Sequence, residues 1–208
     1  MASILQAAAT KQENRRARKK QQGVSAWMDN GNYLGLLTTL GLVFHVADAK
    51  NNNTTAIGYS YGEHGTNTIY VAVKGPPQPD PKVVSAQASG LDIPHSDVVI
   101  IGNTSGLHAE TSIIRHATGG DKSALLSDFF YLEIACIGKG VCPDCSGFMT
   151  KYSIPHTTVR SNVASDWVNP FSGAHFHGTG QNLQYRKAGK SFSSISPGSQ
   201  YAKGWANN

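Results

Sequence analysis

Two short segments of the sequence carry residue types that together bind a transition metal. His108-Ala-Glu110 is followed 34 positions later by Cys142-Pro-Asp-Cys145. A neutral imidazole and two thiolates are three protein ligands that suit Zn²⁺, and they leave the fourth tetrahedral position for water. The residue types and their spacing therefore predict one catalytic zinc ion per chain, with His108, Cys142 and Cys145 as its ligands.

A carboxylate lies two residues beyond the predicted histidine ligand. Glu110 is near enough to take a proton from the metal's water and return it to a substrate, without being a ligand itself. A structural zinc site would have no use for that carboxylate and would need a fourth ligand. Cys136 is available, but it lies in an apolar run and is better explained as a small core residue. A thioredoxin-like interpretation of the Cys-x-x-Cys segment leaves His108 and Glu110 unexplained.

Both segments are expected to follow a strand and to open a helix. A helix over 105–117 carries His108 and Glu110 and ends at Gly119-Gly120. A second helix, over 143–152, starts at a proline, whose missing N–H donor would be unpaired at a first helical position anyway. Cys142 and Cys145 then direct both sulfurs to one point, where the positive end of the helix favours the thiolate form.

The rest of the pattern predicts a layered domain. The remaining elements expected are a helix over 32–49, strands over 56–61 and 68–73 joined by a hairpin loop, an extended and exposed proline-rich stretch over 76–81, strands over 98–101 and 130–137, and a strand over 156–160. Beyond residue 162 the sequence is rich in Ser, Gly and aromatic residues and shows little periodicity. Because strands alternate with helices, the fold class is α/β.

The paired segments resemble the signature of the cytidine deaminase-like superfamily, which is H-x-E followed by C-x-x-C. The resemblance covers about half of the chain, from residue 56 to residue 160. It implies a mixed β-sheet sandwiched by helices, one zinc ion, and hydrolytic removal of an exocyclic amine from a nucleobase. It also implies that His108, Cys142 and Cys145 are the ligands and that Glu110 is the proton shuttle.

The loop before the first cysteine differs from many members of that superfamily. Val141 stands where many of them have proline, and the loop resembles the divergent deaminases of bacterial polymorphic toxins, some of which act on DNA. Proline-rich residues 75–97 look like an insertion in a minimal core. The residues expected around the substrate are Asn103, Ser105, Ala109, Lys139 and Val141. Of these, Lys139 would lie near a phosphate of the substrate.

The net charge of +5 is unevenly distributed. Residues 1–20 and residues 146–208 each carry a net charge of +5, and residues 21–145 carry −5. Positive ends suit an anionic partner such as nucleic acid, because they neutralise phosphates and release counterions. A solvated helix face or a targeting tail would explain residues 1–20 equally simply.

The C-terminal part of the chain leaves two interpretations open. Aromatic residues there are interleaved with cations, a pattern that suits base stacking and equally suits a small lobe packed on the core. The aromatic residues in question are Trp167, Phe171, Phe176 and Tyr185. His175-Phe-His177 favours a loop that holds no metal, and His116 favours a packed or exposed helix residue.

These observations lead to one prediction of function. We expect a zinc-dependent hydrolase that converts cytosine to uracil within nucleic acid, DNA being favoured over RNA, in the manner of a toxin-type effector whose partner would be an immunity protein. The alternatives are a salvage enzyme for free cytidine or its nucleotides, an adenine deaminase, and a non-catalytic zinc-binding module. The expected organisation is a basic arm over 1–23, a deaminase core over 24–162 and an aromatic, basic extension over 163–208 that packs on or near the active site.

Composition excludes two other classes of protein. The longest apolar stretch, 34–46, is too short for the roughly 20 residues of a membrane span, so no membrane partner is expected. Three cysteines do not make a disulfide-stapled scaffold. The charged first residues do not resemble a signal peptide, so we expect a cytoplasmic enzyme or an effector exported without one.

Overall fold

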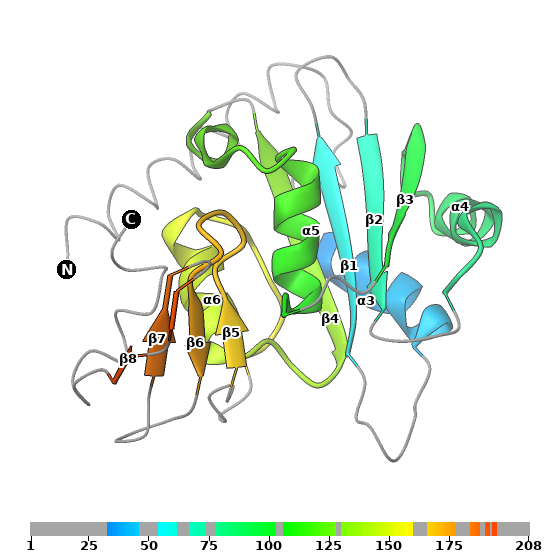
Figure 1. Ribbon diagram of the computed structural model, residues 1–208. Coiled ribbons are helices and arrows are strands. Elements are labelled where there is room, and N and C mark those ends of the chain that lie inside the picture. The colour runs from blue at the N-terminus through cyan, green and yellow to red at the C-terminus, as the bar shows by residue number, and fades with distance from the viewer. Residues whose placement is uncertain are drawn as a thin grey trace.

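The computed structural model describes ten segments of the chain. They are residues 33–45, 54–61, 67–73, 78–102, 106–127, 130–159, 166–177, 184–187, 190–191 and 193–194. These segments form an open four-stranded mixed sheet with helices against both faces, and a second, smaller sheet from the C-terminal part lies beside α6 (Figure 1). The α/β class is therefore confirmed. The predicted arm over 1–23 lies outside the described residues.

The elements alternate along the chain until the small sheet begins. The helices are α3 (Tyr33–Phe44), α4 (Pro81–Gly90), α5 (Ala109–Ala117), the 3-10 helix η1 (Lys122–Leu126) and α6 (Pro143–Lys151). The strands of the large sheet are β1 (Thr54–Tyr61), β2 (Asn67–Val73), β3 (Asp97–Ile101) and β4 (Tyr131–Gly138). Those of the small sheet are β5 (Asp166–Val168), β6 (His175–His177), β7 (Gln184–Arg186) and β8 (Ser193–Ser194).

The large sheet has the strand order β3-β2-β1-β4. β1 runs antiparallel to both β2 and β4, as the predicted hairpin requires, and β3 runs parallel to β2. The register places Gly58 opposite Tyr70 on one side and Ile134 on the other. Because β4 ends where α6 begins and β3 leads towards α5, this sheet positions the starts of both helices.

Side chains alternate between the two faces of the sheet and form two separate cores. Ala56, Leu132 and Ile134 pack with α5 and α6 on one face. Ile57 and Tyr59 pack with α3 and α4 on the other. The period-two alternation of buried residues on β1 and β4 thus separates the face that carries the predicted metal ligands from a face that is structural.

Two predicted elements differ from the structure near their ends. The helix expected from residue 105 begins at Ala109, because His108 has extended backbone angles (φ −73°, ψ 158°) and occupies the N-cap position. The strand expected over 156–160 is reduced to isolated parallel bridges at His156 and Val159. The Thr157 hydroxyl accepts the hydrogen bond of the Cys136 N–H at 2.9 Å, in place of the backbone carbonyl that a regular ladder would supply.

Three further elements differ from the predictions. The helix expected over 32–49 ends at Phe44. Among the described residues, no helix has the length and apolar character needed to cross a membrane. The proline-rich stretch is not extended throughout, since Pro81 is the first residue of α4. Asp80 caps this helix by accepting a hydrogen bond from the Lys82 N–H at 2.8 Å. The small C-terminal sheet has no counterpart in the predictions.

The close packing of α5 against Gly58 of β1 generates a stability prediction. A Cβ atom at Gly58 would lie 2.6 Å from Cγ2 of Ile113, whereas Gly90 has open space around it. Gly58→Ala should therefore lower the free energy of unfolding by about 1–3 kcal/mol through overpacking. Gly90→Ala should leave it unchanged or slightly raised. Urea denaturation followed by circular dichroism measures both, and equal losses in the two variants would contradict this account.

Candidate metal centre

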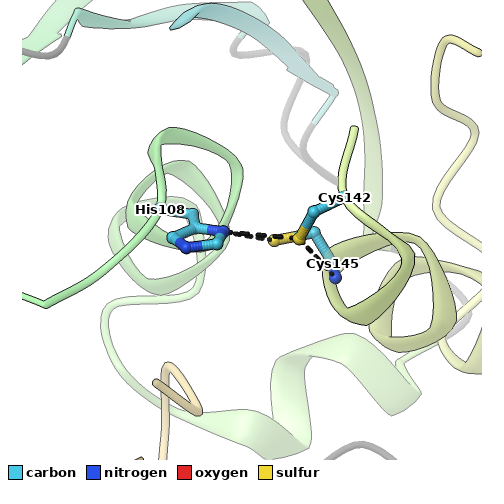
Figure 2. Close-up of side chains that lie close together, drawn as sticks. All are labelled: His108, Cys142 and Cys145. Atoms are coloured by element: carbon cyan, nitrogen blue, oxygen red, sulfur yellow. Dashed lines mark hydrogen bonds between the residues drawn. The ribbon is translucent and has the colours of Figure 1, made fainter. Parts of the chain in front are cut away.

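His108 occupies the N-cap of α5 and is held there by the backbone. Its carbonyl oxygen accepts hydrogen bonds from the Ser112 N–H at 2.8 Å and from the Thr111 hydroxyl at 3.0 Å. Its side chain makes no capping bond to the helix. The ring is therefore directed away from its own helix and towards α6 (Figure 2).

The two cysteines lie at the start of α6, as the sequence predicts. Cys142 is the N-cap and Pro143 the first helical residue, and the Cys142 sulfur accepts a hydrogen bond from the Cys145 N–H at 3.4 Å. Both cysteines are almost fully buried, at 1% and 0% exposure. A proline that fits the first turn and a cap made by sulfur give local reasons for this helix to begin at Cys142.

The three predicted ligands meet between the two helix starts. Nδ1 of His108 lies 3.4 Å from Sγ of Cys142 and 3.3 Å from Sγ of Cys145 (Figure 2). The three ligand atoms are within 4.8 Å of one another, close enough to bind one metal ion. In the part of the chain that the structure describes, no fourth His, Cys, Asp or Glu joins this group. Cys136, the fourth ligand that a structural site would recruit, is not a member.

The protonation states of the group are set by mutual contact and by burial. Hydrogen bonds from Cys145 and His108 lower the pKa of Cys142 to about 4, although burial opposes them. Burial, together with the neighbouring Cys142, raises the pKa of Cys145 well above its ordinary value. Burial alone would lower the pKa of His108, but the hydrogen bond and the charge of Cys142 outweigh it and raise that pKa. The site thus already holds one thiolate, the form in which cysteine binds metal.

Glu110 is buried in the first turn of α5, beside the three predicted ligands. Its exposure is 4%, and burial raises the pKa of its carboxyl group, while the charge of His108 acts in the opposite direction. Burial raises the pKa of the Cys136 thiol well above its ordinary value, and this thiol and the Glu110 carboxyl group are close enough that each affects the pKa of the other. Sequence reasoning missed this partnership, because it treated Cys136 only as core. The period-two alternation of β4, which places Cys136 on the same face as the site, was the signal available.

The residues expected around the substrate fall into three groups. Asn103 and Ser105 lie outside the described residues. Ala109 is half-buried at the start of α5, and Val141 is fully buried next to Cys142 and bridges to Val159. Lys139 is exposed in the turn between β4 and α6. Ala109 and Val141 thus adjoin the predicted ligands His108 and Cys142 in the chain, whereas the Lys139 side chain is exposed to solvent.

The aromatic residues of the C-terminal part serve the core. Trp167 is fully buried and Phe176 is 6% exposed, and both pack in the core that contains Cys142 and Cys145. Phe171 stacks on Phe148 of α6 with a centroid distance of 6.0 Å. The packing interpretation therefore holds for these three residues, and the side chain of Tyr185 lies outside the described structure.

The histidine pair of the C-terminal part was wrongly expected to form a loop. His175 and His177 are the ends of strand β6, and both rings donate a hydrogen bond to Oδ1 of Asp166, at 2.8 and 2.9 Å. Arg186 donates to Nδ1 of His175 at 3.1 Å. His116, as expected, is an exposed residue of α5, with its ring edge on Tyr70.

Comparison with known proteins adds no family to this geometry. No protein-family model, no curated protein and no solved structure matches the chain. Its chemistry is therefore inferred from the residues described above.

The geometry predicts which cysteines bind metal. Protein purified with zinc should contain one ion per chain, and His108→Ala or Cys145→Ala should lose it, because two remaining ligands hold zinc weakly. Cys136→Ser is the matched control, since it removes a buried thiol of the same core and should retain the ion. Elemental analysis of gel-filtered protein measures the stoichiometry. Loss of zinc in the control would instead make Cys136 a ligand.

Proposed function

We propose that this chain is a zinc-dependent hydrolytic deaminase of the cytidine deaminase-like superfamily, acting on cytosine within nucleic acid. The observation that supports the proposal most directly is the meeting of His108, Cys142 and Cys145 with a buried carboxylate, Glu110, in the first turn of the same helix that His108 caps. Three ligands and an adjacent acid–base residue are the arrangement of a catalytic metal site. The helix-flanked mixed sheet agrees with the fold that the sequence resemblance implies.

The donor set fits zinc. Two sulfurs and one imidazole nitrogen suit zinc, whereas hard cations such as Mg²⁺ or Ca²⁺ prefer oxygen ligands. Cys142, with a pKa of about 4, is ionised at neutral pH, so binding need release no proton from it. Zinc, when bound, would supply the Lewis acidity that makes a water molecule nucleophilic near neutral pH.

The proposed reaction replaces the amino group of cytosine by oxygen. Water adds to C4 of the base, the bond from C4 to the amino nitrogen breaks, and uracil and ammonia are the products. Glu110 takes one proton from the attacking water and delivers it to the ring nitrogen N3. It then takes the remaining proton from the oxygen now bonded to C4 and delivers it to the leaving amine. Burial raises the pKa of Glu110 towards neutral pH, where a proton carrier is most effective.

The choice of a polymeric substrate rests on charge. The two ends of the chain each carry a net charge of +5, and Lys139 is exposed in the loop before α6, three residues before Cys142. Phosphates would be attracted to such ends, and DNA is favoured on the likeness of the cysteine loop to toxin-type deaminases. Since Trp167 and Phe176 are buried, the phosphate contacts carry this preference rather than base stacking by those two rings.

The test of this function is an assay of four substrates with two proteins. Single-stranded DNA, duplex DNA, RNA and free cytidine are incubated with the zinc-loaded chain, and uracil or uridine is quantified by mass spectrometry. Glu110→Gln should keep its zinc and lose activity by about 10²–10⁴-fold, the usual contribution of a positioned acid–base group. Conversion in polymers only is the expected result.

Other outcomes of the same assay would redirect the proposal. Conversion of cytidine alone would make the chain a salvage enzyme for free nucleosides. Equal activity of Glu110→Gln would remove the proposed proton carrier. Zinc binding without conversion of any cytosine substrate would overturn the cytosine assignment and leave adenine deamination or a non-catalytic zinc-binding module.

A further inference from the structure

Strand β5 lies against both the segment that carries His108 and helix α6, through three consecutive residues. The backbone of Asp166 adjoins the His108 ring and is one of several groups that raise the pKa of the imidazole against the larger effect of burial. The Trp167 ring packs on Phe148 of α6, one turn beyond Cys145, with a centroid distance of 6.1 Å. Val168 lies against the turn that precedes His108.

The contact of Val168 is close. Gly106 has a φ of +84°, and a Cβ atom placed there would lie only 3.2 Å from Cγ2 of Val168. Strand β5 therefore touches the segment that leads to one ligand as well as the helix that carries the other two. The strand is itself held from outside, because the Asp166 carboxylate accepts hydrogen bonds from His175 and His177.

Trp167 brings a polar group to this contact. Its indole nitrogen is fully buried and has no hydrogen-bond partner of ordinary geometry among the described residues. The indole lies in the same buried cluster as Cys145 and packs against Phe148 of α6, three residues beyond Cys145. Burial raises the pKa of the Cys145 thiol, and the nearby indole acts in the opposite direction. A buried N–H without a partner is rare and costs free energy, so its position beside a metal-binding sulfur calls for an explanation.

We propose that Trp167 is a positioning residue of the metal centre, whose indole N–H donates a hydrogen bond to the Cys145 sulfur when a metal ion holds that sulfur as a thiolate. A thiolate is a much better acceptor than a thiol, so the unused donor gains its partner on metal binding. Outer-shell partners of this kind fix the orientation of ligands and tune their donor strength. The small C-terminal sheet then belongs to the metal centre, because β5 supports His108 and Cys145 together. The inference rests on the metal binding of the proposed function, but not on its substrate.

The test removes the N–H and keeps the shape of the ring. Replacement of Trp167 by 3-benzothienylalanine substitutes sulfur for the N–H at nearly constant volume, and Trp167→Phe is the encoded counterpart. The zinc dissociation constant, measured by competition with a chelator, should rise about 10–100-fold in both variants. Phe176→Leu is the matched control, because Phe176 packs on Trp167 at 6.0 Å but offers no polar group, and it should retain wild-type affinity. Wild-type affinity in the benzothienyl protein would overturn the proposal.

Cobalt supplies a readout that loss of packing alone would not change. Loss of a hydrogen bond makes a thiolate a stronger donor, so the sulfur-to-cobalt charge-transfer band of the Co²⁺ protein should move to longer wavelength in the benzothienyl protein and stay in place in Phe176→Leu. An unmoved band in the benzothienyl protein would contradict the hydrogen bond.

The wild-type chain supplies a test that needs no folded variant of Trp167. The indole N–H resonance of Trp167, assigned through Trp27→Phe and Trp205→Phe, should move downfield and exchange more slowly with solvent when zinc is added. An unchanged resonance in zinc-saturated protein would overturn the proposal. A chain that shows the shift but deaminates nothing would retain this inference and lose the proposed function, whereas a chain that binds no zinc would lose both.

Discussion

Two thiols, an imidazole and a carboxyl group share one buried site, and their removal from water constrains the structure around them. Ionised groups tolerate burial only when they are paired and hydrogen-bonded. Cys142 meets this condition through His108 and through the N–H at the start of α6, and the charge of His108 opposes the effect of burial on Glu110. A shift of α5 relative to α6 would leave charge without a partner. The close packing of α5 on β1 at Gly58 opposes such a shift.

A comparison among the histidines shows what distinguishes this site. Nε2 of His95 meets the hydroxyl of Ser85 at 2.7 Å, and Nε2 of His156 meets the hydroxyl of Ser146 at 2.8 Å. In both cases Nδ1 contacts the carbonyl oxygen two residues earlier in the chain. Such rings are satisfied by the polypeptide itself and support its structure. Nδ1 of His108 instead faces two sulfurs, an arrangement that a metal ion would complete.

The sequence predicted those parts of the site that depend on local rules. Pro143 and Cys142 specify the start of α6 through propensity and capping, which operate within one helical turn. The beginning of α5 was placed too early, because nothing local shows that His108 would be extended. Helix α4 is not among the predictions, because the run of prolines favours an extended stretch, although Asp80 before a proline is equally typical of a helix start.

Other contacts were beyond sequence reasoning because they join distant segments. The short strands of the small sheet have little periodicity, and they are held by cross-strand contacts such as those of Asp166 with His175 and His177. Trp167 reaches α6 only after the chain has turned back onto the core. No spacing rule relates residues 22 positions apart, such as Cys145 and Trp167, so these partners emerge only from the tertiary structure.

Cys136 is a third buried thiol in the core that contains the candidate metal centre. It lies on the face of β4 that packs with α5 and α6, but its sulfur is not among the ligand atoms that meet there. Burial and the nearby Glu110 charge raise its pKa well above the ordinary value, so it remains a thiol and a donor. Burial favours the protonated form of the Glu110 carboxyl group, and the neighbouring Cys136 thiol acts more weakly in the opposite direction. The pKa of Glu110 is therefore raised towards the range that a group accepting and returning a proton would need.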